Sequence, residues 1–140
     1  MKTNLSIIFK VSFWLWLAAL LILSYYPKLP TTKIEIGDEI IRLDYIGHLI
    51  FYAVLIILFL LWKADSEFKT PGRIFIFSLL VGLAFASINE ISQLFIPERT
   101  FNPLDLIYNC LGIILGALFI YFGFAKRLLL KIKVKRQKFK

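Results

Sequence analysis

Four long apolar runs, separated by short polar segments, dominate the pattern of the chain. They cover residues 5–24, 45–62, 72–96 and 103–124. Each run is close to the roughly 20 residues that an α-helix needs to cross the hydrocarbon core of a bilayer. The pattern therefore predicts an all-α protein, an integral membrane four-helix bundle.

Polar residues and prolines mark where these helices begin and end. Thr70-Pro71 and Asn102-Pro103 each place a capping side chain before a proline, which is a common start of a helix. Asp44 has an N-cap-like position before the second run, where a carboxylate accepts hydrogen bonds from the unpaired backbone N–H groups of the first turn. Pro97 ends the third helix.

Two segments near the N-terminus need a separate interpretation. The first run follows Lys2 and Lys10 as in a signal peptide, but no small-x-small cleavage site follows it. We interpret it as an uncleaved membrane helix. Residues 27–43 hold two prolines, Gly37 and mixed charge, so we expect a loop, with residues 34–43 also considered as a short interfacial helix.

Composition agrees with a membrane protein of one domain. Of the 140 residues 59% are hydrophobic and the mean hydropathy is +0.78, which is too apolar for an ordinary soluble domain. We expect a transmembrane domain over residues 1–125 and a basic cytoplasmic tail over residues 126–140. The lone Cys110 excludes a disulfide within the chain.

The net charge of +8 reflects membrane topology and not nucleic-acid binding, since the basic residues stand mainly beside apolar runs. With a cytoplasmic N-terminus, 13 of the 17 Lys and Arg residues fall on the cytoplasmic side. The positive-inside rule therefore predicts that both termini are cytoplasmic. Membrane lipids are the expected partners, and the tail attracts anionic ones.

Ionisable and amide side chains occur in pairs near one end of three of the helices. Asp44 and His48 are four residues apart, as are Asp105 and Asn109, while Glu90 and Gln93 are three apart. Residues at these spacings share one face of a helix. A carboxylate near hydrocarbon costs roughly 2.5–3.5 kcal/mol, so such residues face a protein interior or a watery cavity. We expect the three pairs to meet at the outer face.

Two further features complete this picture. Arg99 lies in the turn between the third and fourth helices, close enough in sequence to fold over the same place. Gly112 and Gly116 form a small-x-x-x-small pair that lets a neighbouring helix approach closely, and we interpret them as packing residues.

Three acids and a histidine against one arginine leave excess negative charge, which favours a bound cation, a protonated histidine or a protonated carboxyl group. Such a set holds a divalent metal or performs acid–base chemistry in other proteins. However, the sequence has no His-Glu-x-x-His, no Gly-x-Ser-x-Gly and no Walker loop. No specific catalytic motif, metal site or cofactor is indicated.

The chain also resembles the VanZ-like family of small bacterial membrane proteins over residues 44–120. The residues that carry the resemblance are Asp44-x-x-x-His48-x-x-x-Tyr52, Asn89-Glu90-x-x-Gln93-x-Phe95-x-Pro97-x-Arg99 and Asp105-x-x-x-Asn109-x-x-Gly112-x-x-x-Gly116. Tyr45 and Glu98 depart from the family pattern, which commonly has Lys and Gly there. The resemblance implies a multi-pass protein of the bacterial cytoplasmic (inner) membrane, linked through the family's namesake to resistance to the glycopeptide teicoplanin.

Three functions follow as hypotheses. The favoured one is a site that binds a cell-envelope lipid or lipid-linked head group, with an effect on glycopeptide susceptibility. The others are a small membrane enzyme that uses His48 or Glu90 as acid–base residues, and a structural bundle with a hydrogen-bonding polar core. The predicted ligand-binding residues are Asp44, His48, Glu90, Gln93, Arg99, Asp105 and Asn109.

Overall fold

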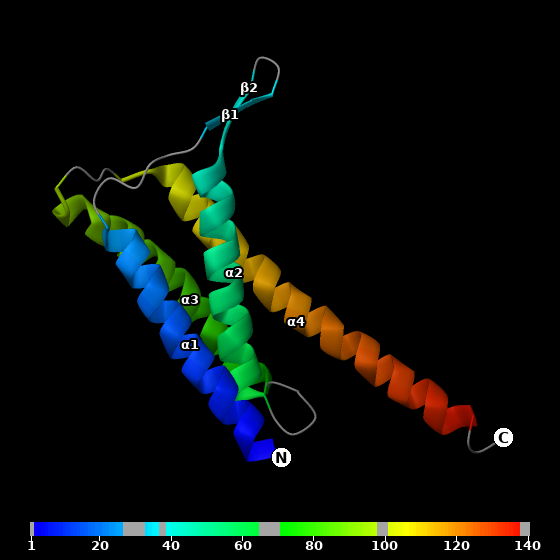
Figure 1. Cartoon of the computed structure of the whole chain (residues 1–140). Coiled ribbons are helices and arrows are strands. Elements are labelled where there is room, and N and C mark those ends of the chain that lie inside the picture. Colours follow the sequence, from blue (N-terminus) through cyan, green and yellow to red (C-terminus); the bar gives the residue numbers. More distant parts are fainter. Residues whose placement is uncertain (1, 27–32, 37–38, 65–70, 98–100, 138–140) are drawn as a thin grey trace.

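The computed structural model confirms an all-α bundle of four long helices (Figure 1). It describes residues 2–26, 33–36, 39–64, 71–97 and 101–137. The helices are α1 (Lys2–Tyr25), α2 (Leu43–Lys63), α3 (Gly72–Ser92), which a 3-10 turn η1 (Gln93–Phe95) extends, and α4 (Pro103–Gln137). Each contains a segment long and apolar enough to cross a membrane, namely Ser6–Tyr25, Leu43–Lys63, Gly72–Phe95 and Pro103–Gly123.

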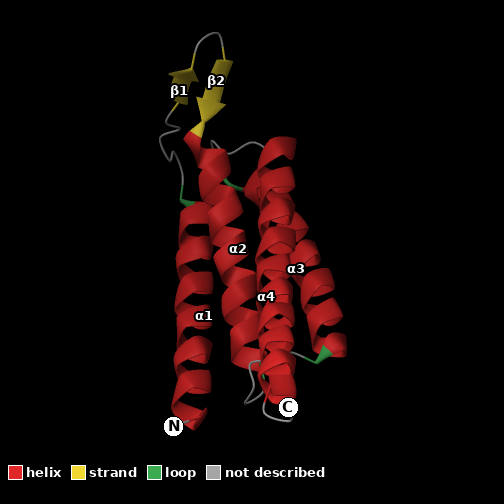
Figure 2. Cartoon of the chain, turned by 90° about the vertical axis from the view of Figure 1, so that its right-hand side faces the viewer, coloured by secondary structure: helices red, strands yellow, loops and turns green. Residues whose placement is uncertain are grey.

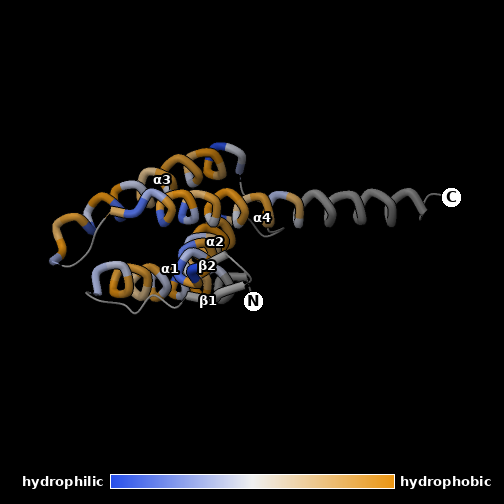
Figure 3. The backbone as a smooth tube through the Cα atoms, turned by 90° about the horizontal axis from the view of Figure 1, so that it is seen from above, coloured by the Kyte–Doolittle hydropathy of each residue, from blue (hydrophilic) through white to orange (hydrophobic). Residues whose placement is uncertain are grey.

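The helices lie side by side in the order α1, α2, α4, α3, an order seen both from the side and from above (Figures 2 and 3). The most extensive packing joins α2 to α4, and α1 packs mainly on α2. With four spans, both termini lie at the same end of the bundle (Figure 2). We call the opposite end, where α1 ends and α2 begins, the hairpin end.

The close approach of α2 and α4 depends on two glycines. A Cβ atom on Gly112 would collide with the backbone carbonyl of Leu49, and one on Gly116 would lie 2.6 Å from the carbonyl oxygen of Ala53. Such contacts are impossible for any larger residue without moving a helix. The predicted packing role of Gly112 and Gly116 is therefore confirmed.

Apolar side chains fill the centre of the bundle. The buried hydrophobic residues are Leu20, Tyr52, Leu55, Ile56, Leu60, Ala86, Ile113, Ala117 and Ile120. On the α1–α2 interface the indole ring of Trp16 stacks on Phe51, with centroids 4.8 Å apart, and its Nε1–H donates to the Phe51 carbonyl oxygen at 2.9 Å. A pairing of this kind satisfies the polar edge of a large aromatic ring inside an apolar bundle.

The expectation for residues 34–43 is wrong where it places an interfacial helix. Strands β1 (Lys33–Ile36) and β2 (Glu39–Arg42) pair antiparallel, with Ile34 opposite Ile41 and Ile36 opposite Glu39. The isoleucines favour extended backbone, and Gly-Asp between two β-branched runs is a hairpin signal. The segment therefore forms a short hairpin that stands above the helices (Figure 1).

Two helix boundaries agree with the expectations. α4 begins at Pro103, and the Asn102 Oδ1 accepts from the Leu104 N–H at 3.1 Å, which is the predicted cap. α3 begins at Gly72, although Pro71 itself has the N-cap position, and Thr70 lies outside the described residues.

Two other boundaries differ. Asp44 is not the N-cap of α2, because the helix already begins at Leu43 and Arg42 precedes it. α4 continues well past 124, to Gln137, so the first residues of the basic tail are helical. Lys, Leu and Arg are strong helix formers, and neither glycine nor proline follows Gly123 to stop the helix.

Candidate functional site

Seven polar side chains lie together at the hairpin end of the bundle, six of them buried and one, His48, half-buried. They come from three helices: His48 and Tyr52 from α2, Asn89, Glu90 and Gln93 from α3 and its 3-10 extension, and Asp105 and Asn109 from α4. We call these seven residues the polar cluster. Glu90 and Asn109 are fully buried, with exposed fractions of 0%. Burying such groups is costly unless they are hydrogen-bonded, so their partners decide what the cluster can do.

His48 connects α2 to α4 through both of its ring nitrogens. Its Nδ1 lies 2.9 Å from the Asn109 Oδ1, and its Nε2 lies 3.8 Å from an Asp105 carboxylate oxygen. Because an amide oxygen only accepts, Nδ1 is the donor. A neutral His48 therefore presents the lone pair of Nε2 toward Asp105, and a protonated His48 forms an ion pair there.

Asn109 connects His48 to Glu90 on α3. Its Nδ2 lies 3.4 Å from the Glu90 Oε2, where an amide N–H donates to a carboxylate. This contact fixes the orientation of the amide group, since a carboxylate accepts only. The other Glu90 oxygen accepts from the backbone N–H of Asn102 at 3.4 Å. A hydrogen-bonded chain thus crosses three helices, from His48 through Asn109 to Glu90.

Asn102 also holds the start of α4 beside Asp105. Its Nδ2 donates to the Asp105 Oδ1 at 2.9 Å, so the other Asp105 oxygen is the one that faces His48. Asn102 therefore orients a carboxylate of the cluster and also caps the N-terminus of α4.

Asn89 ties the cluster to α1 and α2. Its Nδ2 donates to the Ser24 Oγ and to the Tyr52 Oη, both at 2.9 Å. One turn further on, the Tyr25 hydroxyl pairs with the Ser92 Oγ at 2.7 Å, and Ser92 in turn donates to the Asn89 carbonyl oxygen. All four helices therefore meet at the hairpin end.

Two buried atoms of the cluster have no hydrogen-bond partner within the described part of the chain. These are the Asn89 Oδ1, an acceptor, and the Gln93 Nε2, a donor. The two residues are 2% and 1% exposed, so water does not reach them freely. A buried polar group left without a partner costs about 1–3 kcal/mol, and each such group calls for an explanation.

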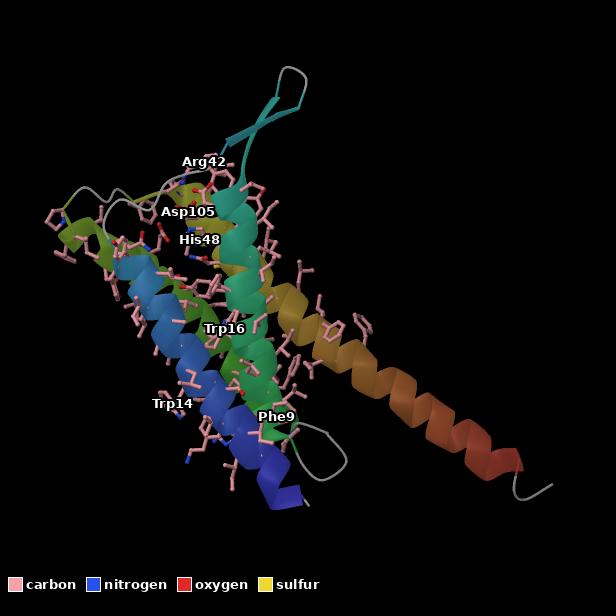
Figure 4. All side chains as sticks on the ribbon, viewed as in Figure 1. Phe9, Trp14, Trp16, Arg42, His48 and Asp105 are labelled. Carbon is pink, nitrogen blue, oxygen red and sulfur yellow. The ribbon has the colours of Figure 1, made fainter. Side chains whose placement is uncertain are left out.

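Arg42 lies at the hairpin end above these residues, and Figure 4 shows Arg42, Asp105 and His48 following one another into the bundle. Its guanidinium group pairs with the Asp44 carboxylate through Nη2 and through Nε at 3.2 Å, and it lies 4.7 Å from the centre of the Tyr45 ring. The hydrogen bond with Asp44 raises the pKa of Arg42 further, although partial burial opposes this. Arg42 is therefore a permanent cation at the hairpin end, above the polar cluster.

The structure brings together most, but not all, of the predicted site residues. His48, Glu90, Asp105 and Asn109 are in contact, and Gln93 is buried on the same helix as Glu90. Asp44 contacts Arg42 instead of a cluster residue. Arg99 lies outside the described residues.

Sequence reasoning missed several residues of the site. Tyr52 and Asn89 stand in the motifs that carry the family resemblance, but they are not among the predicted ligand-binding residues. Ser24 and Arg42 had no such pattern. Asn102, which was predicted only as a helix cap, also orients Asp105.

The predicted acids and histidine do not assemble into a metal site among the described residues. No group of three His, Cys, Asp or Glu side chains is placed there to hold an ion. The arrangement suits hydrogen bonding and proton exchange instead, with His48 and Asp105 as the ionisable pair.

The fold and the cluster together define a multi-pass α-helical membrane protein with a buried polar site at one end of its bundle. The sequence matches the VanZ/LLP1 family over residues 5–126. Because this match covers most of the chain, the protein belongs to that family. No curated protein and no solved structure matches the chain.

Proposed function

We propose that the polar cluster binds the head group of a cell-envelope lipid or of a lipid-linked precursor. The observation that carries this proposal is the pair of buried, unpartnered amide atoms, the Asn89 Oδ1 and the Gln93 Nε2. One accepts and the other donates a hydrogen bond, so together they suit a ligand with hydroxyl groups. A ligand that filled both positions would repay the cost of burying them.

The charged residues at the hairpin end support the same class of ligand. Arg42 is a guanidinium group, which suits planar, bidentate contacts with phosphate or carboxylate oxygens. The His48 and Asp105 pair lies deeper and offers acceptors or a shared proton to a hydroxyl group. A phosphate-linked, hydroxyl-rich head group would match this order of charges. We also propose Arg99 as an additional contact to phosphate, a role that rests on its position in the sequence alone.

Family membership adds the cellular setting of the proposal. We infer that the protein resides in the bacterial cytoplasmic membrane, with both termini in the cytoplasm and the hairpin end facing outward. In that orientation the cluster faces the side where cell-wall precursors are used, so an effect on teicoplanin susceptibility follows from the proposal. The basic residues at the other end support this orientation through the positive-inside rule.

Native mass spectrometry of the detergent-purified protein tests the proposal. Gln93→Leu removes the unpartnered donor at similar volume, so the fold is expected to persist while the lipid adduct is lost. Ser87→Ala is the matched control, because within the described residues the Ser87 hydroxyl donates to the Leu83 carbonyl oxygen of its own helix and to no cluster residue. The proposal would be refuted if the wild type carried only bulk phospholipid and if the amount of bound lipid were the same in Gln93→Leu.

A membrane enzyme is the second candidate, and one observation favours it. The His48 Nδ1–H is fixed by Asn109, which leaves Nε2 directed toward the Asp105 carboxylate. Enzymes with a histidine base hold Nδ1–H in the same way, and their Nε2 takes a proton from the reacting group, which would here have to enter between His48 and Asp105. The enzyme hypothesis requires turnover of a bound lipid that His48→Ala stops without releasing the lipid. The structural-bundle hypothesis requires instead that cluster variants change stability alone.

A further inference from the structure

Below the polar cluster the bundle contains an apolar cavity of about 220 Å³. Residues of all four helices line it, with α1 and α3 on its two sides: Phe13, Leu17, Leu55, Ile56, Phe59, Phe77, Ser78, Val81, Gly82, Phe85 and Ile113. The one polar side chain among them, Ser78, donates its hydroxyl to the Ile74 carbonyl oxygen at 2.5 Å. The wall therefore offers almost nothing to a polar molecule or to water.

The cavity lies at the depth of the bilayer interior. Phe13 and Leu17 are 12 and 8 residues from Tyr25 at the end of α1. At 1.5 Å per residue this places them about 12–18 Å from the hairpin end of the helix. The hydrocarbon core is about 30 Å thick, so the cavity is near its middle.

One edge of the cavity is open to the surrounding lipid. Phe77 and Val81, on the α3 side, are 63% and 48% exposed although both line the cavity. Seen from the hairpin end, α1 and α3 lie at opposite ends of the row of four helices, so neither covers the other (Figure 3). A lipid chain can therefore enter between them without crossing a polar barrier.

The cavity and the polar cluster are continuous along the same helix faces. On α3, Phe77, Val81, Phe85, Asn89 and Gln93 follow one another at intervals of four residues, so the cavity wall leads directly to the two unpartnered amides.

The same change from apolar to polar occurs on the two neighbouring helices. Ile56 of α2 is four residues from Tyr52, and Ile113 of α4 is four residues from Asn109. The Tyr52 and Phe85 rings lie in contact at the boundary, with centroids 6.2 Å apart.

We propose that the cavity between α1 and α3 holds one hydrocarbon chain of the lipid whose head group occupies the polar cluster. This inference rests on the proposed function and narrows it to an amphipathic ligand that enters sideways from the bilayer. The volume is below the roughly 300–1,000 Å³ of sites that enclose a whole small molecule. It suits a segment of a single chain, and any second chain stays in the bilayer.

Two physical terms favour this occupant. The atoms that line an empty apolar cavity lack dispersion contacts on one side, so filling the cavity is favourable. At this depth of the bilayer, hydrocarbon chains are the abundant molecules that can fill it. Lipid tails are as apolar as the cavity, so there is no hydrophobic gain in leaving the bilayer. Attachment to a bound head group supplies the selectivity, because it makes the second contact intramolecular.

Photocrosslinking in nanodiscs tests the proposal. The probe is phosphatidylglycerol with a diazirine in the middle of one acyl chain, and labelled residues are mapped by mass spectrometry of the full-length protein. Val81→Trp blocks the open edge of the cavity, whereas Leu80→Trp, on the exposed neighbour that does not line it, is the matched control. Circular dichroism checks that both variants keep the wild-type helix content and thermal midpoint.

We expect labels on Phe85 and Leu17 in the wild type and in Leu80→Trp, and their loss in Val81→Trp. Labels on these residues that are no more frequent than on lipid-facing Ile76, or that persist unchanged in Val81→Trp, would overturn the proposal. Gln93→Leu separates the two proposals. Suppose that Gln93→Leu retains as much lipid as the wild type and that its cavity residues are still labelled. That result would refute the head-group site in the polar cluster and would support a chain-binding cavity on its own.

Discussion

The His48 Nδ1 and the Asn109 Oδ1 lie 2.9 Å apart across the interface between α2 and α4. This contact joins the helix pair that packs most extensively in the bundle, at the level where its interior changes from apolar to polar. Asn109 also donates to Glu90, so one amide group determines how three helices meet.

Replacing Asn109 is expected to destabilise the bundle. Asn109→Leu removes both hydrogen bonds and leaves the Nδ1–H of the half-buried His48 without its acceptor. The expected loss in the free energy of unfolding is about 1–3 kcal/mol, the usual cost of orphaning a buried polar group. Thermal unfolding in detergent, followed by circular dichroism, measures it. Ser87→Ala is the control, and an Asn109→Leu midpoint equal to that of Ser87→Ala would contradict the prediction.

The two glycines of α4 are expected to tolerate no side chain. Gly116→Ala places a Cβ atom 2.6 Å from the Ala53 carbonyl oxygen, so α2 and α4 must separate. Overpacking of this kind costs typically about 1–3 kcal/mol. Gly123→Ala, on the same helix, has no neighbour within 4 Å of the added atom and is expected to be neutral or mildly stabilising. Thermal midpoints that fall equally in both variants would show that the helix contact is not the cause.

Arg42 is expected to contribute to ligand binding more than to stability. Its pair with Asp44 is partly exposed, and such ion pairs are worth about 0–1 kcal/mol. Arg42→Gln should therefore leave the thermal midpoint nearly unchanged while reducing retention of an anionic lipid in native mass spectrometry. A large fall in the midpoint with full lipid retention would assign Arg42 a structural role instead.

The charge of Arg42 also predicts a pH dependence. Hydrogen bonding to Asp44 raises the pKa of Arg42, so the side chain stays protonated as the pH rises through 10. In Arg42→Lys the cation is lost at a lower pH than in the wild type, because the ordinary lysine pKa of about 10.4 lies well below that of arginine, and Asp44 favours the charged form of both. Between pH 7.5 and about 10.5, retention of an anionic lipid should fall more in Arg42→Lys than in the wild type. Equal losses in both proteins would show that this cation does not contact the lipid.

Topology is tested with single cysteines. In a Cys110→Ala background, Asp38→Cys lies in the connection between the two strands and Lys140→Cys in the basic tail. The charge distribution predicts that a membrane-impermeant maleimide labels intact cells at the first position and not at the second. The reverse pattern would place the polar cluster on the cytoplasmic side and refute a site for an externally exposed head group.

Helix positions could be predicted from the sequence because each apolar run is long enough to span a bilayer and is bounded by polar residues or proline. Pairs at helical spacing also indicated which side chains share a face, and His48, Glu90 and Asn109 do meet. Exposure of a polar side chain to lipid is costly, so polar residues at the same depth on neighbouring helices face the interior of the bundle and contact one another.

Other features depended on tertiary contacts that no local pattern encodes. Asp44 is a residue type that commonly caps helices, but its carboxylate pairs with the guanidinium group of Arg42 in the preceding strand instead. Ser24 is one of several serines, and only the position of Asn89 makes it part of the site. The unpartnered amides of Asn89 and Gln93 could not be foreseen either, since a missing partner is visible only when the neighbours are placed.

The length of α4 has a consequence for the depth of the site. This helix has 35 residues, or about 52 Å at 1.5 Å per residue, against a hydrocarbon core of about 30 Å. Asp105 and Asn109 stand near one end of this rod, and the basic residues that begin at Lys126 belong to the other. Raising α4 by one helical turn would pull Lys126 into the lipid, whereas lowering it would carry the basic end further from the membrane. The charges on the far side of the membrane therefore limit how far the polar cluster can rise out of the bilayer.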